Sequence, residues 1–279
     1  MENSFYTDLA EERRSAAALS AGYCLEEKRE GVFAWTLLEI QTEEAASAIQ
    51  KPVGRYHTLS FPSVLDLTKE EREALSDELA EGLWRLSPRK SGRVLAVGLG
   101  NRTMTADAVG PLTADGILAT AHLKAASPDA LADLPFSLFV TVPGVTAQSG
   151  MDTLTALSAL ASRLSPDLIL AIDALAAREP GRLLRTVQLC DTGVAPGSGL
   201  GRGGDALSEE TLGVPVLALG VPTVISAPAL LEAAGGKREA LSAEAAALFV
   251  SPGTLDAELS LLTPLLAKAI NRVYGIEGV

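Results

Sequence analysis

Cysteine and histidine are scarce in this sequence of 279 residues, which contains two of each. The cysteines, Cys24 and Cys190, cannot form a disulfide framework, and no Cys-x-x-Cys pair offers a zinc site. His57 and His122 fall within a predicted strand and a predicted helix, where a partly buried structural histidine is the usual outcome. The sequence also lacks a Gly-x-Ser-x-Gly elbow and a His-Glu-x-x-His motif. We therefore expect no serine or cysteine nucleophile, no metal and no other cofactor.

Positive charge and long apolar runs are also limited. Lysine and arginine number 23 against 35 aspartates and glutamates, so the formal net charge is −12. Such a surface repels phosphate backbones and anionic lipids, so direct nucleic-acid binding is not expected. No apolar run reaches the length of about 18 residues that a membrane span needs, and Met1–Tyr6 lacks the features of a signal peptide. These absences predict a cytoplasmic protein without membrane contact.

Apolar runs and helical patterns alternate along most of the chain. Continuous apolar runs, typical of strands buried on both faces, lie at residues 93–98, 137–142, 167–172, 185–190 and 214–220. Helical patterns lie at about 68–87, where Thr68 and Glu71 form a capping box, and at about 107–123, 152–164 and 255–273. The alternation predicts an α/β fold with a mostly parallel central sheet covered by helices on both faces.

The first 66 residues have a different pattern. They are rich in charge, and alternation at residues 32–37 and 54–61 predicts antiparallel strands. We expect a β-rich decoration over residues 9–66 and an α/β core over residues 67–279. Within the core, residues 196–204 form a glycine-rich loop that is either a simple connector or a functional segment, and its backbone amides are candidate donors to a substrate oxygen.

Two aspartates follow predicted strands. Asp107 begins the helix after the 93–98 strand, and Asp173 ends the 167–172 strand. Ligands of open α/β sheets bind beyond the carboxyl ends of the strands, so both carboxylates could face one crevice. Two close carboxylates cannot both ionise easily; one can take a proton from water while the protonated one donates to a substrate carbonyl. The pair predicts amide hydrolysis, against the alternatives of a helix N-cap for Asp107 and a turn residue for Asp173.

Several long motifs follow one another along the chain. They are Val97-Gly-Leu-Gly-Asn-Arg102, Thr105-Ala-Asp-Ala-Val-Gly-Pro111, Pro143-Gly-Val145, Pro166-Asp-Leu-Ile-Leu-Ala-Ile-Asp-Ala-Leu-Ala-Ala-Arg178, Asp191-Thr-Gly-Val-Ala-Pro-Gly-Ser-Gly199, Leu207-Ser-Glu-Glu-Thr-Leu-Gly-Val-Pro-Val216 and Gly220-Val-Pro-Thr-Val224. Together these motifs resemble the germination protease family of spore-forming bacteria. The resemblance extends from about Thr7 to the C-terminus.

This resemblance implies an atypical aspartic endopeptidase that degrades small acid-soluble spore proteins during germination, in the cytoplasm of the spore core. It implies Asp107 and Asp173 as the catalytic aspartates and a three-layer α/β/α sandwich like that of hydrogenase maturation proteases. It also implies a homotetramer made as a self-processing zymogen. The family's leader junction matches Thr7-Asp-Leu-Ala10. Cleavage is expected between Asp8 and Leu9, which makes residues 1–8 a propeptide, shorter than is usual for the family, and residues 9–279 the peptidase domain.

Two other functions remain open from the residues alone. In a nickel-dependent hydrogenase maturation protease, the same aspartates would hold the metal together with a histidine. A non-catalytic binding module would use the acidic surface to dock a basic partner protein. Nickel titration separates the first from a metal-free peptidase, and incubation with a spore protein substrate separates the second.

Overall fold

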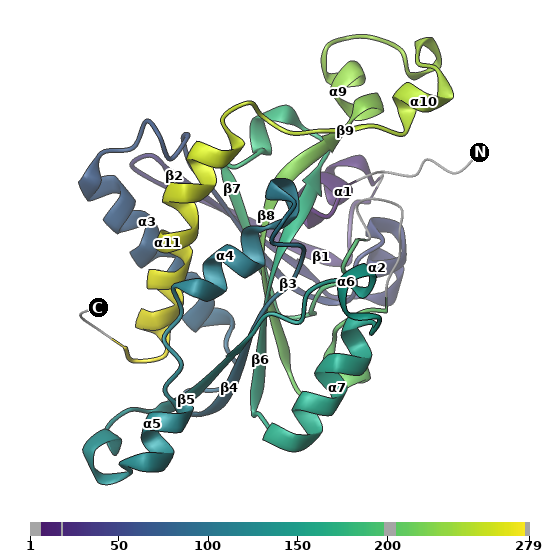
Figure 1. The fold of residues 1–279 in the computed structure, drawn as a ribbon. Coiled ribbons are helices and arrows are strands. Elements are labelled where there is room, and N and C mark those ends of the chain that lie inside the picture. The colour runs from purple at the N-terminus through teal and green to yellow at the C-terminus, as the bar shows by residue number, and fades with distance from the viewer. Residues whose placement is uncertain (1–6, 18, 198–204, 277–279) are drawn as a thin grey trace.

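The computed structural model describes residues 7–17, 19–197 and 205–276. These residues form one nine-stranded mixed sheet with helices on both faces (Figure 1). The strand order is β1-β2-β3-β7-β8-β6-β4-β5, and β9 pairs with β8. The strands are β1 (Tyr23–Glu30), β2 (Phe33–Ile40), β3 (Gly54–Ser60), β4 (Gly92–Gly98), β5 (Phe136–Thr141), β6 (Leu168–Ala177), β7 (Thr186–Cys190), β8 (Val216–Ser226) and β9 (Phe249–Val250).

Helices connect most of these strands. The α-helices are α1 (Ala10–Ala16), α2 (Glu43–Ile49), α3 (Lys69–Leu86), α4 (Val109–Asp115), α5 (Ala121–Ala126), α6 (Thr146–Ser149), α7 (Thr153–Leu164), α8 (Glu209–Leu212), α9 (Ala227–Ala233), α10 (Ala243–Ala246) and α11 (Leu255–Val273). Short 3₁₀ turns are η1 (Thr105–Asp107), η2 (Asp129–Leu131), η3 (Pro180–Arg182) and η5 (Arg238–Ala240). In the part of the chain that is described, no helix has the length and apolar character needed to cross a membrane.

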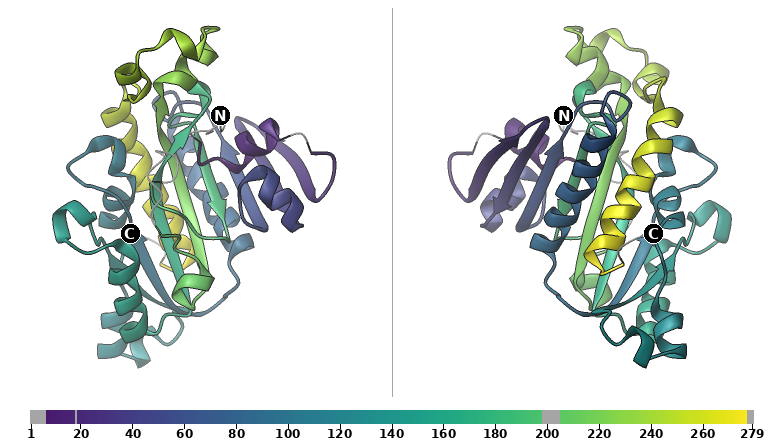
Figure 2. Two further views of the ribbon diagram at one scale, coloured as in Figure 1. Left: turned by 90° about the vertical axis from the view of Figure 1, so that its right-hand side faces the viewer. Right: turned by 90° about the vertical axis from the view of Figure 1, so that its left-hand side faces the viewer.

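The centre of the sheet is parallel. Strands β5, β4, β6 and β8 pair in parallel with their neighbours, whereas β7 pairs antiparallel to β8. Residues in β6 alternate between two cores, so Leu170 faces α3 and α11 while Ala171 faces α7. Figure 2 shows the helices on both sides of the sheet. This arrangement confirms the predicted α/β fold and the three layers of an α/β/α sandwich.

The N-terminal residues extend the same sheet. β3 pairs antiparallel with β7, and β2 and β1 follow outward, so the predicted β-rich decoration is an antiparallel edge of the central sheet (Figure 2). β1 was not predicted as a strand because most of its residues are exposed and charged. An edge strand tolerates this composition, since charge discourages pairing with other chains.

Three predicted elements near the candidate site have wrong boundaries: the 107–123 helix, the 167–172 strand and the 214–220 strand, which spans Val216–Ser226 as β8. The predicted 107–123 helix is divided into η1, α4 and α5, because the chain leaves the helix at Gly116 and the backbone N–H of Leu118 donates to Asn271 Oδ1 at 3.0 Å. β6 continues to Ala177, five residues beyond the predicted end at residue 172, because β8 also continues and pairs with it.

Candidate functional site

Asp173 lies within β6 and not at its end. The sequence predicts that the strand ends at Asp173, but Ala174–Ala177 still pair with β8, across a bulge after Leu175. Asp173 is 6% exposed, and its Oδ1 accepts a hydrogen bond from the backbone N–H of Ala174 at 2.9 Å. A carboxylate is therefore held inside a sheet, where burial of its charge is costly.

Asp107 is the last residue of η1, and Ala108, not Asp107, is the N-cap of α4. The backbone N–H of Asn101 donates to Asp107 Oδ2 at 2.9 Å and to its main-chain oxygen at 3.0 Å, which closes the loop after β4. Gly100 permits this closure, because its φ is +109° and a Cβ would lie 2.1 Å from the main-chain oxygen of Asp107. Thr223 Oγ1 of β8 donates to the main-chain oxygen of Ala106 at 2.6 Å and fixes η1 over the sheet.

The two aspartates are electrostatically coupled. Burial, followed by the charges of Asp107 and Asp8, raises the pKa of Asp173 to about 8, against the lowering by the hydrogen bond from Ala174. Burial also raises the pKa of Asp107, which is half-buried. The raised pKa of Asp173 favours its protonated form near neutral pH. A proton shared between the two carboxylates stays a prediction.

A cavity of about 180 Å³ lies on the face of the sheet that Asp173 occupies. Asp173 and Gln188 of β7 both pair with Gly220 of β8, so the three residues form one row across adjacent strands. Gly220 carries no side chain, and a Cβ there would lie 2.4 Å from Leu175 Cδ1. Asp107 is not among the described residues that line this cavity. The charged and polar side chains that line the cavity include those of Asp8, Arg13, Gln50, Lys51, Tyr56, Asp173, Gln188 and Thr192.

The predicted leader junction is buried, and its Asp8 lines this cavity. Thr7, Asp8, Leu9 and Ala10 are all buried. The backbone N–H of Asp8 donates to the oxygen of Ala176 at 2.8 Å, and Asp8 Oδ2 accepts from the N–H of Ala176 at 2.9 Å. The Leu9 side chain packs in an apolar cluster that includes Leu175. The segment that the sequence marks for cleavage therefore lies against the strand that carries Asp173.

Glu12 holds the segment Thr7–Ala10 against the end of β6. It is 5% exposed, accepts from Thr7 Oγ1, and accepts from the backbone N–H groups of Arg178 at 2.8 Å and Glu179 at 2.9 Å. Its pKa is raised because burial outweighs these hydrogen bonds. The carboxylate thus satisfies two backbone donors just beyond β6.

Replacing Glu12 with alanine should lower the free energy of unfolding by about 3 kcal/mol, since several buried donors would lose their acceptor. Urea denaturation at neutral pH measures this loss. Glu26→Ala in the exposed strand β1 serves as the control and should change stability by less than about 0.5 kcal/mol. Equal stability of the two variants would contradict the anchoring role of Glu12.

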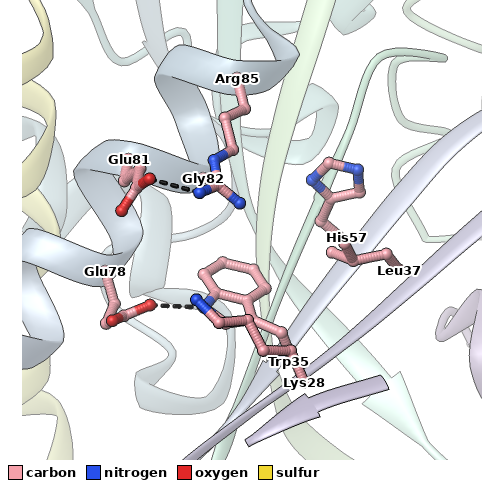
Figure 3. Close-up of a pocket in the computed structure, with 8 residues that line it drawn as sticks. All are labelled: Lys28, Trp35, Leu37, His57, Glu78, Glu81, Gly82 and Arg85. Atoms are coloured by element: carbon pink, nitrogen blue, oxygen red, sulfur yellow. Dashed lines mark hydrogen bonds and ion pairs between the residues drawn. The ribbon is translucent and has the colours of Figure 1, made fainter. Parts of the chain in front are cut away.

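His57 has structural surroundings, whereas His122 of α5 is exposed, contrary to the partly buried position expected for it. His57 stands edge-on to Trp35, with ring centroids 6.5 Å apart, beside a cavity of about 20 Å³ under α3 (Figure 3). Burial lowers the pKa of His57 to about 4, so the ring is neutral at physiological pH. Cys24 is exposed, whereas Cys190 is buried, and this burial raises the pKa of the Cys190 thiol and disfavours its thiolate.

The 20 Å³ cavity has room for about one water molecule and lies between the three strands β1, β2 and β3 and the helix α3. In Figure 3, Trp35 Nε1 donates to Glu78 Oε2, at 2.6 Å, and Glu81 pairs with Arg85. Among the described residues, no three histidine, cysteine, aspartate or glutamate side chains gather into a possible metal site. Most of the 196–204 loop, with its candidate donors, lies outside the described residues.

Sequence reasoning missed Gln188, Lys51 and Arg13 as cavity residues. Gln188 carried a usable signal, because an amide side chain interrupts the otherwise strand-like run Thr186-Val-Gln-Leu-Cys190. Lys51 and Arg13 carried none, since both lie in charged N-terminal segments whose place beside β6 depends on tertiary packing.

Comparison with known proteins agrees with the motifs. The model of the family described as germination protease matches residues 4–234, a span that contains the junction, the cavity and both aspartates. A germination protease from Clostridium perfringens is 39% identical over 193 residues, which are 69% of this chain and 59% of that protein. One from Priestia megaterium is 39% identical over 74% of this chain and 56% of its own length. One from Clostridium acetobutylicum is 37% identical over 81% of this chain and 72% of its own length.

Proposed function

Because the chain belongs to the germination protease family, we propose that it is an endopeptidase in which Asp173 and Asp107 hydrolyse a peptide bond without a metal. The observation that carries the proposal is Asp173 itself. Its pKa is raised to about 8, and it lines a cavity whose wall includes Asp8 of the sequence that matches the family's leader junction. A carboxylic acid that is kept neutral at pH 7 can donate a hydrogen bond to a substrate oxygen.

The reaction divides the work between the two carboxyl groups. Asp107, as carboxylate, takes a proton from a water molecule whose oxygen attacks the peptide carbonyl carbon. Asp173, as acid, donates its proton to the carbonyl oxygen as charge develops there. When the C–N bond breaks, the proton held by Asp107 passes to the departing nitrogen, and Asp173 recovers its proton as the new carboxyl group forms. The pair thereby returns to its starting state, and its titration belongs to both groups together.

We further propose that the protein is made as a zymogen with residues 1–8 as propeptide. Asp8 and Asp173 line the same cavity, and the Leu9 side chain packs in the apolar cluster that includes Leu175. While this segment stays bound, a second extended peptide cannot pair with the backbone of Ala176. Cleavage would free the main-chain groups of β6 for substrate.

The test is the mass of the purified protein held at mildly acidic pH. We expect loss of residues 1–8 through cleavage after Asp8, because acidic conditions keep Asp173 protonated. A chelator should leave the rate unchanged. Retention of the full mass in the wild-type chain under all conditions between pH 5 and pH 8 would refute self-processing at this bond.

The substrates that we propose are small acid-soluble spore proteins, cleaved in the spore core by a homotetramer. The name of the relatives, germination protease, supports a role in spore germination. The net charge of −12 suits basic, DNA-coating substrates better than nucleic acid itself. Incubation with a purified spore protein, followed on a gel, should show discrete fragments, and size-exclusion chromatography measures the oligomeric state.

A further inference from the structure

Gln188 is placed opposite Asp173 in the cavity. Both residues pair with Gly220, so one glycine-bearing strand separates them. Neighbouring strands lie about 4.8 Å apart, so the two main chains are about 10 Å apart. A peptide bond that lies over Gly220 would therefore have the Asp173 side chain on one side and the Gln188 side chain on the other. Gln188 is 6% exposed, so its amide is nearly as buried as the Asp173 carboxyl.

The hydrogen bonds of Gln188 fix which way its amide faces. Oε1 accepts from the backbone N–H of Ala10 at 2.7 Å, and Nε2 donates to the main-chain oxygen of Asp8 at 3.3 Å. An N–H can bond only to the amide oxygen, so the amide nitrogen must face Asp8. The oxygen that it contacts is the carbonyl oxygen of the Asp8–Leu9 bond.

The neighbouring cations act elsewhere on the segment. Arg13 Nε donates to the main-chain oxygen of Thr7 at 2.7 Å. The Asp8 charge raises the pKa of both Lys51 and Arg13, against the lowering by burial. These two side chains therefore interact with the preceding carbonyl group and with the Asp8 charge. The Asp8 carbonyl oxygen itself accepts from Gln188 Nε2.

We propose that Gln188 is a catalytic residue that donates a hydrogen bond to the carbonyl oxygen of the scissile peptide bond and stabilises its developing negative charge. This inference rests on the proposed endopeptidase function. The 3.3 Å contact is longer than the 2.7–3.1 Å range for a donor to an oxyanion. This distance can shorten as the carbonyl carbon becomes tetrahedral and the oxygen moves. The hydrogen bond would then stabilise the transition state more than the bound substrate.

Two substitutions separate this role from a structural one. Gln188→Glu keeps the acceptor for the Ala10 N–H but removes the N–H donor, whereas Gln188→Met removes both. If Gln188 only seats the N-terminal segment, the methionine variant alone should be impaired. If it serves the carbonyl oxygen, both variants should lose about 100-fold or more in kcat at pH 7, with little change in KM.

The experiment measures cleavage of a synthetic peptide with the sequence Thr-Asp-Leu-Ala, together with self-cleavage by mass and folding by thermal melting. Thr186→Val is the matched control, because its buried Oγ1 lies on the same strand and has no hydrogen-bond partner among the described residues. It should keep the wild-type kcat. Wild-type kcat in folded Gln188→Met would overturn the role of Gln188 alone, whereas a wild-type protein that cleaves neither peptide nor itself would overturn the endopeptidase and this role together.

Discussion

Asp173→Asn should abolish peptide-bond cleavage and, at the same time, make the protein more stable than the wild type as pH rises toward 8. Asparagine has nearly the same shape but neither donates an acidic proton nor ionises. Loss of the acid should reduce the rate by at least about 10³-fold, because a catalytic acid contributes about 10²–10⁴-fold and its partner works only as part of the pair.

The stability effect follows from the position of the carboxyl group. The pKa of Asp173 is raised from an ordinary 3.8 to about 8, chiefly by burial. Between these values the folded chain holds a proton that the unfolded chain has released. The wild-type free energy of unfolding therefore falls as pH rises from about 4 to about 8. The asparagine variant lacks this loss, so its Tm should rise relative to wild type across that window and level off above pH 8.

Thermal melting from pH 4 to pH 9 and peptide cleavage at pH 6 measure the two effects. The matched control is Asp66→Asn, which makes the same chemical change at an exposed carboxylate and should alter neither the activity nor the pH dependence. A Tm difference that does not change with pH would contradict the raised pKa. Retained cleavage in Asp173→Asn would remove the residue from the mechanism even if the stability effect were present.

Much of the fold is legible in the sequence because apolar runs and caps are local signals. The Thr68–Glu71 capping box begins α3, Ser87 ends it, and α11 has the boundaries that its apolar periodicity predicts. The geometry of the site depends instead on contacts between residues that lie far apart in the sequence. Asp173 was predicted to end its strand because a charged side chain usually marks a surface, but the pairing of β8 beyond Gly220 keeps β6 in the sheet. Tertiary pairing overrode residue preference there.

The prediction that Asp107 and Asp173 lie together shows the same difference between local signals and long-range contacts. Strand-end reasoning brought Asp107 and Asp173 toward one region, and their electrostatic coupling agrees with that placement. It could not reveal that the cavity beside Asp173 is also lined by Gln188 and by Asp8, whose carbonyl oxygen Gln188 contacts. Those contacts join residues that are separated by most of the chain, so no pattern within a sequence window encodes them.

Gly110→Ala should damage both the fold and the site, although it adds a single methyl group. Gly110 is the second residue of α4, at the point where this helix passes the end of β4 and the middle of β6. A Cβ there would lie 2.3 Å from the Leu99 oxygen, 2.4 Å from the Leu99 nitrogen and 2.4 Å from the Ile172 oxygen. All three are backbone atoms, and the Leu99 N–H donates to the Ile172 oxygen at 2.8 Å. The methyl group would therefore intrude on the hydrogen bond that joins the two strands immediately before Gly100 and Asp173.

Backbone atoms cannot rotate away as a side chain can, so α4 must move outward or the Leu99–Ile172 bond must break. We expect a loss of about 3 kcal/mol or more in the free energy of unfolding, at or above the upper end of the usual cost of overpacking. Cleavage activity of the remaining folded protein should also fall, because η1 and Asp107 are continuous with α4. Urea denaturation and peptide cleavage give the two readings. Gly181→Ala is the control, since its Cβ meets nothing within 4 Å, and it should stay within about 0.5 kcal/mol of wild type. If Gly110→Ala were as stable and as active as Gly181→Ala, the close packing of α4 on β4 and β6 could not be the feature that positions Asp107.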